Sequence, residues 1–172
     1  MKKIGYLVVL ISCVMLGCVK NTATTSSQTC PYTTPTTVAP DSEVTYLKNY
    51  LSVRSITAIK DSSGFFYSID SVGSGTAPTV CSTITINYTG KLLLANSSNP
   101  VFDSNSNIAL VLGTLIAGWQ KSIPFIKPGG SLNLYLPPSL AYGSTAVVGS
   151  NGTVIIPANS YLQFKVQLLY VQ

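Results

Sequence analysis

Few side chains in this sequence could do acid–base or nucleophilic chemistry. Histidine is absent, which removes Ser-His and Cys-His nucleophilic machinery and most catalytic zinc sites. The acidic residues are Asp41, Glu43, Asp61, Asp70 and Asp103, too widely spaced in the sequence to predict a catalytic carboxylate pair. Neither a phosphate-binding loop nor a dinucleotide fingerprint is present. Any activity must therefore use few charged groups, and we expect no metal and no cofactor.

The basic residues also exclude one class of partner. Ten basic and five acidic residues give a net charge of +5. Apart from Lys2 and Lys3, the basic residues are scattered singly, without the interleaved aromatics of a basic binding patch. We expect no binding to nucleic acid.

The first 17 residues have the composition of a secretory signal peptide. Lys2 and Lys3 precede an apolar run of about 14 residues over 4–17, which is short for a bilayer-spanning helix of roughly 20. A basic start and a short apolar core ahead of small residues are typical of a removable export signal. A buried N-terminal helix is the alternative interpretation.

The end of this segment predicts a lipid anchor. Met15-Leu16-Gly17-Cys18 resembles a bacterial lipobox, whose cysteine is lipidated and becomes the mature N-terminus. Residues 10–13 fit the same pattern at Cys13, but they would leave an unusually short apolar core. We therefore expect lipidation at Cys18. The localisation that follows is outside the cytoplasm, anchored to a bacterial membrane on the periplasmic face or at the outer membrane.

Two further cysteines, Cys30 and Cys81, remain after these assignments. Two thiols in an exported protein are expected to pair. The disulfide would close a loop of about 50 residues and contribute roughly 4 kcal/mol on the loop-entropy model. Two separate inert thiols are the alternative.

The chain after the signal divides into a tether, a helical appendage and a larger domain. Residues 18–40 are rich in Thr, Ser and Pro and predict an extended tether. Residues 41–63 predict an appendage with a short helix, capped by Asp41 or Ser42 and carrying apolar residues on one face. The domain is expected over 64–172.

Hydrophobic periodicity within 64–172 predicts the fold class. Apolar residues alternate around 65–69, 84–88, 108–112 and 132–136, and 161–171 forms a last long apolar segment. One helix is expected at 115–122, ended by Pro124. About five antiparallel strands around one short helix make an α+β arrangement. Residues 138–157 lack clear periodicity and predict a long loop that folds over something.

Seven short motifs occur in order along this domain. They are Ile86-Asn87-Tyr88-Thr89-Gly90, Val101-Phe102-Asp103-Ser104, Leu112-Gly113 with Leu115-Ile116-Ala117-Gly118-Trp119, Pro128-Gly129-Gly130, Leu136-Pro137-Pro138-Ser139-Leu140-Ala141-Tyr142-Gly143, Ile155-Ile156-Pro157-Ala158-Asn159, and residues 162–169. Together they resemble the FKBP-type peptidyl-prolyl cis-trans isomerases over roughly residues 64–172. The resemblance implies an FKBP-like curved antiparallel sheet wrapped around one short helix, with an aromatic pocket between them.

The resemblance also implies roles for individual residues. It places the catalytic groups at Asp103, Tyr142, Trp119, Phe102 and Ile116, with Trp119 as the pocket floor. The substrate-binding positions that it implies are Tyr88, Leu115, Ile108, Leu110, Ile155, Ile156 and Phe164. The implied activity is isomerisation of X–Pro bonds in exported proteins without covalent chemistry.

Three departures from the family pattern bear on that activity. Ile108 stands where many members have phenylalanine, so the pocket wall would be less aromatic. The segment after Asp103 is short and has no arginine to pair with this carboxylate. The loop after Tyr142 is longer, with residues 146–150 inserted, which would alter the lid and the affinity for macrolides. A non-catalytic peptide-binding or chaperone module is therefore the alternative function.

The resemblance and the lipobox together imply the partners. We expect proline-containing polypeptide clients, a macrolide as a further candidate ligand, a membrane contacted through the lipid anchor, and a monomeric protein.

Overall fold

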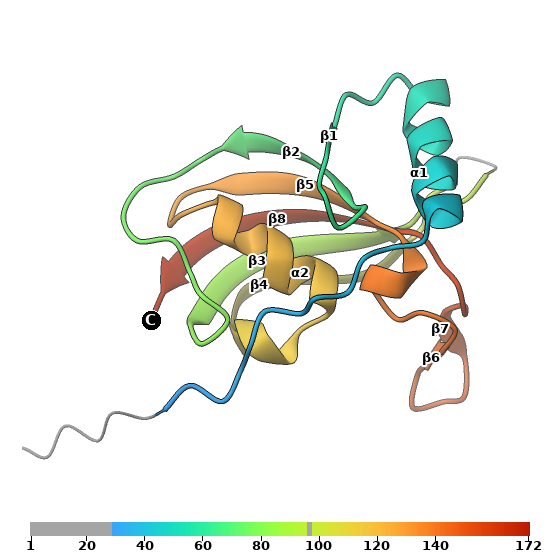
Figure 1. The fold of residues 1–172 in the computed structure, drawn as a ribbon. Helices are drawn as coiled ribbons and strands as arrows, with labels where there is room; N and C mark the ends of the chain where they lie inside the picture. Colours follow the sequence, from blue (N-terminus) through green and yellow to red (C-terminus); the bar gives the residue numbers. More distant parts are fainter. Residues whose placement is uncertain (1–28, 96–97) are drawn as a thin grey trace, which may run out of the picture.

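A computed structural model describes residues 29–95 and 98–172 (Figure 1). The main sheet contains β1 (Ile59–Lys60), β2 (Phe66–Ser71), β3 (Thr83–Leu92), β4 (Val101–Val111), β5 (Ser131–Leu136) and β8 (Leu162–Val171). The other elements are α1 (Asp41–Val53), α2 (Ala117–Ser122), the 3₁₀ turns η1 (Leu112–Thr114), η2 (Ile123–Phe125) and η3 (Pro138–Leu140), and a hairpin of β6 (Val147–Val148) and β7 (Val154–Ile156). The signal peptide expected at 1–17 and the lipidation site expected at Cys18 lie outside the described residues.

The six-stranded sheet has the order β1-β2-β5-β8-β3-β4 and every pairing in it is antiparallel. One face is apolar because alternate side chains on a strand point the same way. On this face Ile84, Ile86, Leu132, Leu134 and Leu136 are fully buried. The predicted α+β class and the curved sheet around one short helix are confirmed. The sheet has five long strands plus the two-residue β1, which the sequence did not reveal.

Helix α2 lies against the apolar face of the sheet (Figure 1). It begins two residues later than predicted, because Leu115 and Ile116 are extended and Ile116 occupies the N-cap position. The helix ends at Ser122, and Pro124 lies in η2, as expected for a residue that cannot continue a helix. A Cβ on Gly118 would overlap the Leu136 side chain, so the helix and β5 are in close contact there.

Helix α1 covers the end of the sheet where β3 ends and β8 begins (Figure 1). The ring of Tyr46 on this helix stacks on the ring of Tyr161, and the two ring centroids are 4.3 Å apart. Val44, Leu47, Tyr50 and Leu51 are buried and belong to the same core cluster as the sheet residues. The side-chain cap expected from Asp41 or Ser42 is wrong. Pro40 occupies the N-cap position, and the acids fall in the first helical turn, where negative charge is favourable.

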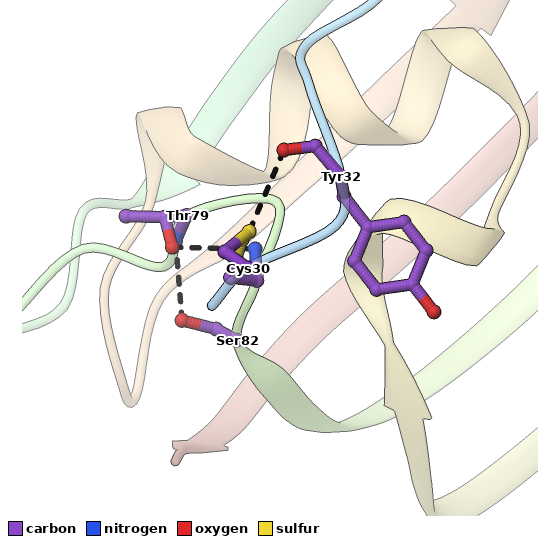
Figure 2. Close-up of a disulfide and its surroundings, with 5 residues drawn as sticks. Cys30, Tyr32, Thr79 and Ser82 are labelled. Carbon is purple, nitrogen blue, oxygen red and sulfur yellow. Dashed lines mark hydrogen bonds between the residues drawn. A yellow bond between two sulfur atoms is a disulfide. The ribbon is translucent and has the colours of Figure 1, made fainter. Parts of the chain in front are cut away.

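Residues 29–40 run along the body of the protein before α1. Cys30 and Cys81 form a disulfide with their Cα atoms 5.7 Å apart. Figure 2 shows this bridge beside Thr79 and Ser82, whose hydrogen bonds shape the turn that carries Cys81. Two residues beyond Cys30, the Tyr32 ring lies so close to Gly113 in η1 that a Cβ there would overlap it. The segment is therefore fastened beside the turn that leads into α2.

The long loop predicted at 138–157 has structure of its own. It contains η3 and the β6–β7 hairpin, which is separate from the main sheet. Val148 and Val154 are more than half exposed on this hairpin, whereas Ile156 is buried. Among residues 29–95 and 98–172, no helix has the length and apolar character needed to cross a membrane.

We expect the disulfide to contribute about 4 kcal/mol to the free energy of unfolding, since it closes a loop with a sequence separation of 51. Urea unfolding with and without a reductant measures this difference. A Cys30→Ser/Cys81→Ser double variant should unfold at the same urea concentration in both conditions. An unchanged midpoint for the native sequence under reduction would contradict the expectation.

Candidate active site

A cavity of about 230 Å³ opens between α2 and the sheet. Strands β3, β4 and β8, the segment around η1, helix α2 and the turn after η3 all contribute to its lining. The lining residues are Tyr88, Phe102, Asp103, Leu110, Thr114, Leu115, Ile116, Trp119, Tyr142 and Phe164. The walls are mostly apolar or aromatic, with one carboxylate and two phenol hydroxyls among them. Such a cavity suits a small apolar ring that is oriented by a few polar contacts.

Three edge-to-face contacts hold the aromatic walls in place. The Trp119 ring lies 5.3 Å from Tyr88 and 5.1 Å from Phe164, at interplanar angles of 81° and 88°. Phe102 meets Phe164 at 5.7 Å and 90°. Each such pair contributes about 0.5–1.5 kcal/mol beyond the burial of its area. The rings therefore form a rigid box, and Trp119, which is 4% exposed, is its floor.

The two phenols and the carboxylate are coupled. The Tyr88 hydroxyl donates a hydrogen bond of 2.5 Å to Asp103 Oδ2, so a phenol takes the place of the arginine that this segment lacks. Burial, and then this hydrogen bond, raise the pKa of Tyr88 well above its usual range. Burial and the negative charge of Asp103 likewise raise the pKa of Tyr142. Both hydroxyls therefore keep their protons at neutral pH and can donate.

Gln120 shapes the backbone at the mouth of the cavity. Its side-chain amide donates to the carbonyl oxygens of Leu115 at 2.6 Å and Gly113 at 3.2 Å. These bonds keep Leu115 and Ile116 extended just before the helix. Gln120 is 8% exposed, so its hydrogen bonds are protected from water.

The sequence matches a known family over this site. Residues 75–169 fit the family model described as FKBP-type peptidyl-prolyl cis-trans isomerase. The chain belongs to this family. The match begins after residues 29–40 and α1, and it includes every residue that lines the cavity.

Individual FKBP relatives show the same likeness. The chain is 34% identical over 128 residues to FkpA of Buchnera aphidicola subsp. Schizaphis graminum, covering 74% of this chain and 48% of that protein. It is 32% identical over 109 residues to the isomerase Mip of Coxiella burnetii, covering 63% of this chain and 45% of that protein. The chain therefore spans about half the length of the curated relatives it matches.

A crystal structure of FkpA from Escherichia coli superposes with a TM-score of 0.62. It is 31% identical in sequence, and the match covers 76% of this chain and 60% of that chain. The FKBP fold of this chain is thus supported by sequence and by structure.

Most of the site residues predicted from the FKBP motifs meet at the cavity, and three lie elsewhere. Ile108 pairs with Ile86 on β3, packs against the core and is not among the residues that line the cavity. Ile155 is 40% exposed on β7, and Ile156 is buried opposite Val147 in the hairpin.

Sequence reasoning missed two residues of this site. Thr114 lines the cavity and donates its hydroxyl to the Val111 carbonyl oxygen at 2.8 Å. Its place between Leu112-Gly113 and Leu115 in the motif was the available signal. Gln120 follows Trp119 directly, but its role depends on where its amide points, which the sequence does not state.

A larger hollow of about 750 Å³ lies on the opposite, polar face of the sheet. Its lining is mainly hydroxyl and amide side chains, and Asn87 Nδ2 donates to Gln167 Oε1 there at 2.9 Å. It has no aromatic box to hold a proline, so the smaller cavity is the better candidate. Within the described part of the chain, no three His, Cys, Asp or Glu side chains gather to hold a metal ion.

We expect Gly90→Ala to disrupt the aromatic box. A Cβ at Gly90 would lie 2.6 Å from Phe102 Cζ and 2.9 Å from Phe164 Cε1, so both rings must move. Overpacking of this kind costs about 1–3 kcal/mol. Urea unfolding measures the loss, and the emission of Trp119, the single tryptophan, reports the displaced rings.

Gly149→Ala is the matched control, because its Cβ would approach only the Asn151 and Ile155 side chains, at 3.2 Å. It should leave Trp119 emission unchanged. A Gly90→Ala protein with native stability and emission would contradict the role given to Gly90.

Proposed function

We propose that this protein is a peptidyl-prolyl cis-trans isomerase that acts on X–Pro bonds of polypeptide clients. The observation that carries the proposal is the apolar cavity floored by Trp119, with protonated phenols and Asp103 among its lining residues. The size and apolar walls of the cavity suit a proline ring. Its few polar groups suit a reaction in which no bond is made or broken.

The barrier to the reaction is the resonance of the amide. Twisting an X–Pro bond costs about 18–20 kcal/mol because it breaks the partial double bond. The planar amide is the more charge-separated state, with negative charge on oxygen and positive charge on nitrogen. An apolar cavity therefore disfavours the planar ground state relative to the twisted state. Each 1.36 kcal/mol or so removed from the barrier gives about a tenfold increase in rate.

The aromatic lining residues would bind the proline ring, and the hydrogen-bond donors would orient the client backbone. The proline ring would rest on Trp119, between Phe102 and Phe164. The carbonyl oxygen before proline would accept from the Ile116 backbone N–H, at the cap of α2. The Tyr142 hydroxyl would donate to a second client carbonyl, which holds one flank of the peptide while the other rotates.

Asp103 would orient the client rather than transfer a proton. Its Oδ2 atom accepts the hydrogen bond from Tyr88, so Oδ1 would accept a hydrogen bond from a backbone N–H of the client. The resulting site needs only proline-containing polypeptides as substrates. A macrolide with a proline-like ring is a second ligand class for the same cavity.

A prolyl isomerisation assay on a chain beginning at Thr29 tests the proposal. We expect acceleration that falls at least about tenfold in Trp119→Ala, which loses the floor, and about three- to tenfold in Tyr142→Phe, which loses one hydrogen bond. Tyr142→Phe is the safer variant, because a cavity left by Trp119→Ala also costs about 3–5 kcal/mol of stability. Tyr170→Phe, at an exposed ring, is the control.

A well-folded native protein without acceleration would refute catalysis. Peptide binding measured by Trp119 fluorescence would then support the alternative of a non-catalytic peptide-binding or chaperone module.

We further propose that the protein is exported and held at a bacterial membrane by a lipid on Cys18. The lipobox-like residues 15–18 and the disulfide between Cys30 and Cys81 support this, because disulfides persist in oxidising compartments. The clients would then be proteins that fold outside the cytoplasm.

We expect Cys18→Ser to move the full chain from the membrane fraction to the soluble fraction of a bacterial host. Cys13→Ser should leave it in the membrane fraction. Release by Cys13→Ser alone would assign the lipid to Cys13, and release by neither variant would contradict the anchor.

A further inference from the structure

Helix α1 contacts the active-site side of the molecule through one carboxylate. Glu43 Oε2 accepts hydrogen bonds from the Ser139 backbone N–H at 3.0 Å and from the Ser139 hydroxyl at 2.8 Å. Both bonds are partly buried, and bonds to an ionised acceptor are among the stronger ones in proteins. Glu43 lies outside the family match over 75–169, whereas Ser139 lies inside it.

Ser139 belongs to a compact turn that carries Tyr142. The backbone N–H groups of Ala141 and Gly143 both donate to the Pro138 carbonyl oxygen, at 2.9 and 2.8 Å. Gly143 has a φ of 59°, a conformation that glycine adopts readily. These bonds tie the turn together, so a displacement of Ser139 displaces Tyr142.

The buried Pro138 and Leu140 hold the middle of the turn, and a hydrogen-bonded anchor holds each of its ends. At its far end, the Gly143 carbonyl oxygen accepts from the Asn159 backbone N–H at 2.8 Å. At its near end it is held by Glu43. Tyr142 is 40% exposed, so packing restrains its ring less than it restrains Trp119, which is 4% exposed. The position of the Tyr142 hydroxyl therefore depends on these two anchors together with the packing of Leu140 beneath the turn.

We infer that Glu43 is a positioning residue for Tyr142. Through Ser139 it sets where the phenol hydroxyl lies at the cavity, so the N-terminal helix is part of the apparatus that orients the client. The catalytic consequence rests on the proposed isomerase function, but the positional consequence does not.

A second hydrogen bond of α1 supplies a matched control. The Tyr50 hydroxyl donates to Asn99 Oδ1 at 2.9 Å, which joins the same helix to the loop after β3. The described residues of that loop, 93–95 and 98–100, do not line the cavity. Loss of this bond removes one contact of α1 and leaves the two Glu43–Ser139 hydrogen bonds in place.

The experiment uses the full chain, purified in detergent, with ¹³C-labelled tyrosine rings. The Tyr142 signal is identified by its loss in Tyr142→Phe. We expect Glu43→Ala to shift this signal and to lower kcat/KM by no more than about three- to tenfold, the loss expected for Tyr142→Phe, because it acts through the same hydroxyl. Glu43→Gln should keep the Tyr142 signal and kcat/KM close to those of the native protein, because its amide oxygen can accept the same two hydrogen bonds. Tyr50→Phe should change neither the Tyr142 signal nor kcat/KM.

A double-variant comparison separates positioning from general support of the fold. If Glu43 acts through Tyr142, adding Glu43→Ala to Tyr142→Phe should lower kcat/KM by less than about twofold. Ser139→Ala removes only the hydroxyl bond and should shift the Tyr142 signal less. It serves as the test if Glu43→Ala does not fold.

An unmoved Tyr142 signal in folded Glu43→Ala or Ser139→Ala protein would overturn the inference. An undiminished effect of Glu43→Ala in the Tyr142→Phe background would overturn it as well. A shifted signal in a native protein that does not isomerise proline bonds would instead refute the proposed function and support the positional role.

Discussion

The close approach of α2 to the sheet determines the rest of the structure. Gly118 has no side chain, and a Cβ there would overlap Leu136 on β5. This contact puts Trp119 within 5.3 Å of Tyr88 and 5.1 Å of Phe164, in edge-to-face geometry. The cavity is the space left above the indole when these rings have packed. A helix further from the sheet would leave the same residues without a defined box.

The N-terminal region braces this arrangement from both sides. Tyr32, next to the disulfide at Cys30, packs on Gly113 in the turn that leads into α2. On the other side, Glu43 holds the turn that carries Tyr142. Helix α1 also shares the core cluster with the sheet. The working unit is therefore larger than the family match over 75–169, and its walls are supported by residues that the family pattern does not include.

Several site residues were predictable because they sit in short motifs with fixed spacing. Tyr88, Phe102, Trp119 and Phe164 alternate or recur at positions that must face the apolar side of a strand or helix. Ile108 lies two residues from Leu110 on β4 and pairs with Ile86, and it packs against the core without being among the residues that line the cavity. Ile155 and Ile156 lie on the hairpin of β6 and β7, whose strands pair with each other and not with the main sheet, and they do not line the cavity. The sequence contained no signal for this separate hairpin.

The sequence by itself determined the α+β class, the family and the aromatic set, because side-chain periodicity and local motifs are properties of neighbouring residues. It also left Cys30 and Cys81 as the pair to be joined. Only the tertiary structure decided that Tyr88 donates to Asp103, that Gly90 makes room for Phe102 and Phe164, and that Glu43 reaches Ser139. Those contacts join residues far apart in the chain, and the distance between such residues is set by packing and strand register, which no local pattern records.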